Sequence, residues 1–459
     1  MVLPNSMAGR DIASYLHPYT NLKTHQETGP LIITRGEGVN VFDEDGNEYI
    51  EGLAGLWCTS LGFSNERLIE AATKAMEQLP FYHGFTHKSH PAGIELAEKL
   101  LAMVPAPMSK VFFANSGSEA NDTAIKIIWY INNALGKPEK KKIISRQKAY
   151  HGVTVATASL TGLPNNQRDF DLPIERILHT DCPHFYRFGA DSEREEEFAT
   201  RCAENLENMI LEEGPETVAA FFAEPVMGAG GVLVPPPTYF EKIQKVLKKY
   251  DILLLADEVI CGFGRTGNMF GSETFGIKPD MITIAKALSS GYLPISALMI
   301  SEDIFQLMVK ESEKIGVFGH GFTYGGHPVP AAVALETLKI YEETDILGHI
   351  RSVAPIMQDK LRQLGTHPLV GEARGVGLIG AIEPVRNKET KEFFDPSAGI
   401  GAYLAGRAQE NGLITRAIGD VLAFAPPLVI DADQIAKMMN MVSKSLDETY
   451  EMAQQKDLI

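Results

Sequence analysis

The sequence is poor in cysteine, and its cysteines show neither a CxxC pair nor a dense framework. Only four occur in 459 residues, at positions 58, 182, 202 and 261. Small secreted domains depend on a high density of disulfides, and this chain has no such density. Reduced thiols are the simplest interpretation, so we expect a cytoplasmic protein.

Long apolar runs and an excess of basic charge are also missing. No stretch is long enough to cross a bilayer, and residues 1–10 do not lead from basic residues into an apolar run. We therefore expect no membrane anchor and no secretory signal. The net charge of −17 disfavours binding to nucleic acid or to anionic membranes and favours small-molecule partners.

From about residue 65 onward, short apolar runs alternate with helical patterns. This alternation predicts an α/β layer with a mostly parallel central sheet. Two β-rich runs on either side of residues 43–47 predict a hairpin near the N-terminus. The runs expected to form the sheet are Lys110–Ala114, Lys142–Ser145, Val218–Ala223, Ile252–Ala256 and Met281–Ala285.

The pattern predicts a large domain and a smaller α+β domain built from both chain ends. We place the N-terminal part of the small domain at residues 1–60 and the large domain at 61–329. The C-terminal part of the small domain then covers residues 330–459, which contain helical patterns and two strand-like pieces.

Lys286 is the only charge in residues 282–294, a run of small and apolar residues. A desolvated lysine loses its proton easily and becomes a nucleophile. A lysine at a strand end can also extend its charged group to solvent, and base rates favour that interpretation. This segment by itself leaves both interpretations open.

Two further segments favour a ligand site at the sheet edge. Residues 115–122 follow a strand-like run, and their Ser-Gly-Ser turn opens a helix, which predicts either a phosphate cradle or an ordinary N-cap. Asp257 ends the strand that begins at Ile252, where α/β sheets bind their ligands.

Other patterns suggest sites that we reject. Residues 262–267 match GxGxxG, but no helix opens directly after them, so a dinucleotide site and a dehydrogenase activity are disfavoured. His83, His87 and His90 have metal-like spacing, as do His179, Cys182 and His184, without partners at a recognised spacing. We expect no metal site.

Several motifs occur together in one order along nearly the whole chain. They are Ser116–Ala120, Tyr150–Gly152, Glu224-Pro225, Asp257–Val259, Lys286 and Gly321–Pro328. This set resembles the class III aminotransferases, which are pyridoxal-phosphate (PLP) enzymes of fold type I. Residues 56–58 and 415–417 are most similar to the ω-amino acid/amine:pyruvate branch.

The resemblance implies that Lys286 binds PLP covalently as an aldimine and that Asp257 lies under its pyridine nitrogen. A carboxylate there keeps the ring nitrogen protonated and makes the cofactor an electron sink. The lysine, once released, can move a proton as general base and then acid. These two residues are the implied catalytic pair.

The resemblance also implies the other cofactor contacts. Tyr150 would stack on the ring and Val259 would pack on its other face, while Thr323 would reach the phosphate of the neighbouring subunit. A homodimer is therefore expected, with a tetramer left open. The remaining implied cofactor-binding residues are Ser116, Gly117, Ser118, His151 and Glu224.

Arg416 matches an arginine that binds the carboxylate of pyruvate or of an amino-acid donor, and its planar fork suits this role. We hypothesise that Glu224 pairs with it at rest. Trp57, Phe85 and Tyr150 are the expected walls of the substrate pocket, and the resemblance implies that Phe85 reaches in from the neighbouring subunit. Ordinary core packing also accounts for Trp57 and Phe85.

Two departures make the pocket less polar than in ornithine-type members, because Ile260 and Met227 replace glutamines. We expect a primary amine or ω-amino acid donor and pyruvate as acceptor, in a ping-pong cycle that yields alanine. Aminomutase or decarboxylating transaminase chemistry is the alternative, and a scaffold that binds phosphate without turnover is a further one.

Overall fold

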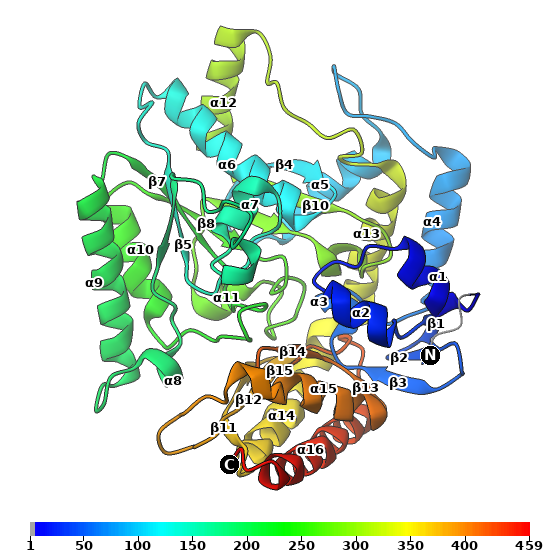
Figure 1. The fold of residues 1–459 in the computed structure, drawn as a ribbon. Coiled ribbons are helices and arrows are strands. Elements are labelled where there is room, and N and C mark those ends of the chain that lie inside the picture. The colour runs from blue at the N-terminus through cyan, green and yellow to red at the C-terminus, as the bar shows by residue number, and fades with distance from the viewer. Residues whose placement is uncertain (1–4) are drawn as a thin grey trace.

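A seven-stranded sheet forms the centre of the molecule in this computed structural model, which describes residues 5–459 (Figure 1). Residues 1–4, which begin the stretch considered above for a secretory signal, therefore lie outside the described residues. The strand order is β4-β10-β9-β8-β7-β5-β6, and only β10 runs antiparallel to its neighbours. The bounds are β4 Met108–Ala114, β5 Lys142–Arg146, β6 Ile177–Thr180, β7 Val218–Ala223, β8 Leu253–Asp257, β9 Met281–Ile284 and β10 Ser296–Ser301.

The central strands are apolar on both faces because helices cover both faces (Figure 1). Within β7, Phe221 belongs to the apolar cluster that includes side chains of α9 and α10, whereas Phe222 belongs to the one that includes α6 and α12. All five runs expected to form the sheet are strands here. The ends of β8 and β9 lie within one residue of the ends expected from the sequence. The helices that cover this sheet are α6 Gly117–Ala134, α7 Val155–Leu160, α9 Glu195–Glu213, α10 Tyr239–Lys249 and α12 Glu302–Ile315.

The two chain ends meet in a second, four-stranded sheet. Strand β3 pairs with β2 on one side and runs parallel to β13, so Ile50 lies opposite Leu413. The expected hairpin is present between β2 and β3, where the Asp43 carboxylate accepts hydrogen bonds from the backbone N–H of Asp45 and Asn47. The elements of this N-terminal region and its partner are α1 Met7–Ser14, α2 Leu22–Thr28, β1 Ile33–Glu37, β2 Asn40–Asp43, β3 Glu48–Glu51 and β13 Leu413–Ile414.

A third sheet of order β11-β12-β15-β14 is entirely antiparallel and packs against the C-terminal helices (Figure 1). The α/β fold class of the fold type I enzymes is confirmed, while the domain limits at residues 60 and 329 stay predictions. The elements here are α13 Pro328–Glu343, α14 Ile346–Leu364, β11 Val370–Val376, β12 Ile379–Pro384, α15 Ile400–Glu410, β14 Arg416–Ile418, β15 Val421–Phe424 and α16 Ala432–Gln455.

Shorter elements connect these layers. Within residues 5–459, every helix is too short or too polar to span a bilayer. The glycine-rich segment 262–267 forms turns, and the next helix, α11, begins only at Gly271. The expectation that no helix opens directly after these glycines is therefore confirmed. The remaining elements are α3 Ala54–Trp57, α4 Glu66–Gln78, α5 Pro91–Met103, α8 Phe185–Phe188, α11 Gly271–Phe275, η1 Pro164–Asn166, η2 Lys286–Ser289 and η3 Pro396–Ala398.

The central strand β7 should be essential for stability. Phe221 is fully buried, so Phe221→Ala should lower the free energy of unfolding by about 3–5 kcal/mol through lost burial and a residual cavity. The matched control is Phe170→Ala, because Phe170 is 70% exposed. Urea unfolding at one fixed protein concentration measures both variants. Equal effects of the two changes would contradict the assignment of Phe221 to the core.

Candidate active site

A cavity of about 330 Å³ lies where strands β4, β5, β7, β8 and β9 end. These strands point the same way, so the residues that follow them meet at one edge of the sheet. Nine residues predicted from separate parts of the sequence line this cavity together. They are Ser116, Gly117, Ser118, Tyr150, His151, Glu224, Asp257, Val259 and Lys286.

Lys286 follows the end of β9 and begins the short helix η2. Its φ angle is +49°, a left-handed conformation that is strained for a side chain of this size. The side chain is half-buried and lines the cavity. Its ammonium group forms no hydrogen bond or ion pair with any residue in the described range 5–459. An unpaired, half-buried amine at a cavity wall favours the interpretation of Lys286 as a nucleophile over its interpretation as a lysine that extends to solvent.

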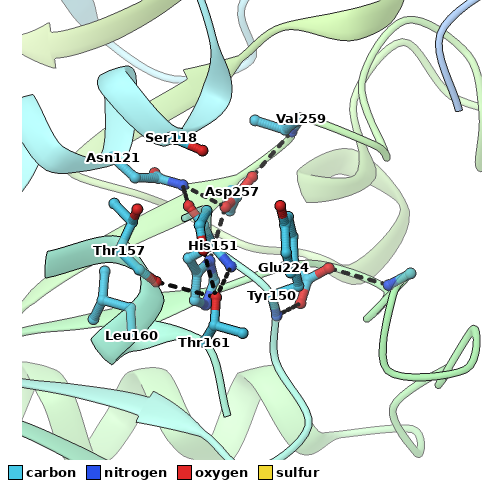
Figure 2. A network of polar contacts seen from close by, with 12 residues as sticks. Ser118, Asn121, Tyr150, His151, Thr157, Leu160, Thr161, Glu224, Asp257 and Val259 are labelled. Carbon is cyan, nitrogen blue, oxygen red and sulfur yellow. Dashed lines mark hydrogen bonds and ion pairs between the residues drawn. The ribbon is translucent and has the colours of Figure 1, made fainter. Parts of the chain in front are cut away.

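Asp257 is the last residue of β8, and its side chain is fixed by three donors (Figure 2). Carboxylate Oδ2 accepts hydrogen bonds from Asn121 Nδ2 at 2.7 Å and from His151 Nδ1 at 2.8 Å. The other oxygen, Oδ1, accepts from the backbone N–H of Val259 at 3.2 Å. Only 3% of the residue is exposed. The carboxylate therefore has one orientation at the cavity.

Asn121 is a site residue that the sequence analysis missed. Its amide nitrogen bridges Asp257 and the carbonyl oxygen of His151, at 2.7 and 2.9 Å. It lies four residues after Gly117 on α6, so the two residues share one face of that helix. This spacing from the Ser-Gly-Ser turn is the signal that could have identified it. Two buried atoms of this network, Asn121 Oδ1 and His151 Nε2, have no hydrogen-bond partner in the described part of the chain.

The N-terminus of α6 forms one end of the cavity. Ser116 is the N-cap and accepts a hydrogen bond from the backbone N–H of Glu119 at 3.2 Å. The amides of Gly117 and Ser118 donate to no acceptor among residues 5–459. A Cβ atom on Gly117 would lie 2.9 Å from Val259 Cγ2. The two interpretations of this turn, an N-cap and a phosphate cradle, are therefore compatible. The Ser116 cap satisfies one N-terminal backbone donor of α6 and leaves the others free for an anion.

Glu224 follows β7 and supports the loops that form the cavity wall (Figure 2). Its two carboxylate oxygens accept the backbone N–H of Tyr150 at 3.0 Å and of Gly228 at 3.1 Å. Burial raises the pKa of this carboxyl group above its ordinary value. The hypothesised ion pair with Arg416 is not formed here, and each carboxylate oxygen accepts a backbone donor instead.

Arg416 lies on β14, outside the residues that line the cavity. Its guanidinium carbon is 5.9 Å from the centroid of the Tyr19 ring. The Tyr19 hydroxyl accepts a hydrogen bond from Asn166 at 2.5 Å. Burial raises the pKa of Tyr150, and the neighbouring Tyr19 raises it further. Tyr19 is a second missed residue, and no pattern in the sequence relates it to Arg416.

Three further predicted residues do not line the cavity within this chain. Trp57 is buried in an apolar cluster with Leu53 and Val226, whereas Phe85 is 42% exposed and Thr323 is exposed. The sequence analysis expected Phe85 and Thr323 to act in a neighbouring subunit, and their exposure is compatible with that expectation.

Two of the histidines with metal-like spacing, His90 and His184, have protein partners. His90 caps α5 through the backbone N–H of Gly93 and contacts the carbonyl oxygen of Gly326. His184 pairs with Glu372 at 2.8 Å.

A larger hollow of about 1500 Å³ is lined by residues such as Pro236 and Lys245 and contains neither Lys286 nor Asp257. We therefore place the chemistry in the smaller cavity.

Comparison with known proteins agrees with this geometry. The sequence model of the family described as Aminotransferase class-III matches residues 22–446. Gamma aminobutyrate transaminase 1, mitochondrial, from Solanum lycopersicum is 51% identical over 453 residues, covering 97% of this chain and 88% of the relative.

Two solved structures have closely similar folds. The omega transaminase from Pseudomonas jessenii in complex with PMP is 57% identical and superimposes with a TM-score of 0.97 over 98% of this chain and 99% of that one. A structure described as a transaminase with L-ala is 58% identical, with a TM-score of 0.91 over 92% of this chain and 100% of that one. Family match and identity together show that the chain belongs to the class III aminotransferases, a family of enzymes that use pyridoxal phosphate.

Proposed function

We propose that this enzyme transfers an amino group from a primary amine or an ω-amino acid to pyruvate, which leaves as alanine. One observation carries the proposal: a single cavity contains the unpaired Lys286 amine, the fixed Asp257 carboxylate and the open N-terminus of α6. An amine nucleophile, an acceptor for a protonated ring nitrogen and a phosphate cradle are the three groups that pyridoxal phosphate requires.

The residues present fit this cofactor. A cavity of about 330 Å³ is within the usual range for small-molecule sites. The free amides of Gly117 and Ser118 would hold the phosphate, and Asp257 would accept a hydrogen bond from the ring nitrogen. Tyr150 and Val259 would enclose the ring, and the Lys286 amine would bind it covalently. Ser116, His151 and Glu224 support these groups through the contacts described above.

When bound, pyridoxal phosphate supplies an electron sink for the negative charge that develops on a substrate carbon. Lys286 Nζ takes the proton from that carbon as general base and later returns a proton as general acid. Asn121 and His151 hold Asp257 in one orientation, so its charge needs no rearrangement during the reaction. The apolar wall that includes Ile260 limits the access of water.

The choice of donor and acceptor rests on the named relatives and on the pocket. One structural relative is named an omega transaminase and another contains L-alanine, the product expected from pyruvate. The curated relative is named for γ-aminobutyrate, which is itself an ω-amino acid, so both sets of names support one donor class. Ile260 lines the cavity as expected, whereas Met227 does not line it and is buried in an apolar cluster with Ala149 and Leu233.

Product analysis tests the reaction directly. With γ-aminobutyrate or a primary arylalkylamine as donor and pyruvate as acceptor, alanine should accumulate in proportion to the deaminated donor. The control reaction replaces pyruvate by 2-oxoglutarate and should be slower. Turnover without any keto acid would instead indicate an aminomutase, and release of carbon dioxide in proportion to product would indicate a decarboxylating transaminase.

Arg416 should recognise the carboxylate of the acceptor. Arg416→Ala should raise the KM for pyruvate roughly 10- to 100-fold, the effect of losing a charged hydrogen bond. Donors without a carboxylate should keep their single-turnover rate. The control is Arg386→Ala, since Arg386 is a surface arginine paired with Glu392. An unchanged pyruvate KM in the Arg416 variant would exclude this role.

Subunit complementation tests the proposal that two chains share each site. Lys286→Ala should abolish turnover, and Thr323→Asp should weaken cofactor binding by repelling its phosphate. Each variant alone should be nearly inactive. In a mixed dimer, the Lys286 of one chain would meet the intact Thr323 of the other, so about half of the sites should be active. No recovery after mixing and reassembly would show that Thr323 does not act across the interface.

A further inference from the structure

We propose that Asp11, His17 and His25 form a binding site for one divalent transition-metal ion of the Zn²⁺ type. The sequence analysis expected no metal site and did not consider these three residues, which lie in separate elements. Asp11 is in α1, His25 is in α2 and His17 is in the turn that connects them. The fold brings their donor atoms together, all within 4.8 Å of one another.

Both histidines direct the same ring nitrogen at one carboxylate. His17 Nε2 is 2.9 Å from each Asp11 oxygen, and His25 Nε2 is 3.0 Å from Asp11 Oδ1. The side chains are 10–22% exposed, so an ion could enter while most of its coordination stays shielded. Two imidazoles and a carboxylate, with a water molecule as fourth ligand, are a donor set that Zn²⁺ accepts in tetrahedral geometry.

The distances need only a small adjustment. Ligands about 2.1 Å from a tetrahedral Zn²⁺ ion are roughly 3.4 Å apart, so each ring would withdraw by about 0.5 Å. Each Nε2 would give up its proton to coordinate, and the neutral ring then carries its proton on Nδ1. Nδ1 of His17 and Nδ1 of His25 are not among the buried nitrogens without a partner in the described residues. This tautomer therefore leaves no buried N–H donor unsatisfied.

A second cluster shows why this one is different. His184, Glu372 and Glu383 also lie close together, but Arg374 contacts both of those carboxylates and Arg187 contacts Glu383. Two guanidinium groups already neutralise that cluster and would repel a cation. Within residues 5–459, Asp11 pairs only with the two histidine rings, and no lysine or arginine forms an ion pair with it.

Tyr19 links the proposed metal site to the candidate active site. Tyr19 lies two residues after His17, and its ring contacts the Arg416 guanidinium. An ion bound to His17 and His25 would fix both ends of the segment that carries Tyr19. Metal binding should therefore restrain one wall beside Arg416 without taking part in the chemistry.

Metal binding to the dialysed holoenzyme tests the site. Titration with Zn²⁺ alone against a chromogenic chelator should show one saturable ion per chain. His25→Gln and Asp11→Asn should each weaken binding at least about 100-fold. The matched control is His367→Gln, because His367 also faces one aspartate, Asp447, at 3.3 Å. That variant should bind Zn²⁺ like the wild type.

Hydrogen exchange provides a readout that does not depend on activity. Zn²⁺ should slow backbone exchange in peptides from residues 7–28 of the wild type and leave the His25→Gln variant unchanged. Circular dichroism of each variant confirms that it is folded. Absence of saturable binding in the wild type, or equal affinity in the His25→Gln and Asp11→Asn variants, would overturn the proposal.

Discussion

The site depends on a buried carboxylate with which no lysine or arginine of residues 5–459 forms an ion pair. Asp257 is almost inaccessible to solvent, and its described partners are an amide, an imidazole and a backbone N–H. Burial of a charge is costly unless hydrogen bonds or an opposite charge compensate for it. The three donors compensate in part, and a protonated ring nitrogen in the cavity would complete the compensation. The same constraint fixes the positions of Asn121 and His151.

The parallel sheet is what makes this arrangement possible. Strands β7, β8 and β9 end at one edge, so Glu224, Asp257 and Lys286 converge although they are far apart in sequence. The covering helices exclude water from the strands but leave this edge open. Helix α6 adds its free N-terminal amides at the same place. Strand ends and a helix terminus, together with the loop that carries Tyr150 and is held by Glu224, therefore position the proposed cofactor contacts.

The sequence allowed prediction of the features that depend on local patterns. Buried runs such as Val218–Ala223 identified the strands, and ordered motifs identified Lys286 and Asp257. Asn121 was missed because its importance comes from a contact across the fold, although its spacing from Gly117 on one helix was a usable signal. Tyr19, and the meeting of Asp11 with His25, could not be predicted, because no short-range pattern records which distant segments lie together. The hypothesised pair of Glu224 with Arg416 is not formed in this structure, where both carboxylate oxygens accept hydrogen bonds from backbone amides.

The most direct test of this account is the site of covalent cofactor attachment. The holoenzyme would be treated with borohydride, which fixes the cofactor to the amine that binds it, and then digested and mapped by mass spectrometry. The account predicts that the peptide containing Lys286 gains the mass of the reduced cofactor. Attachment to another lysine, or no attachment in a protein that contains stoichiometric pyridoxal phosphate, would contradict it.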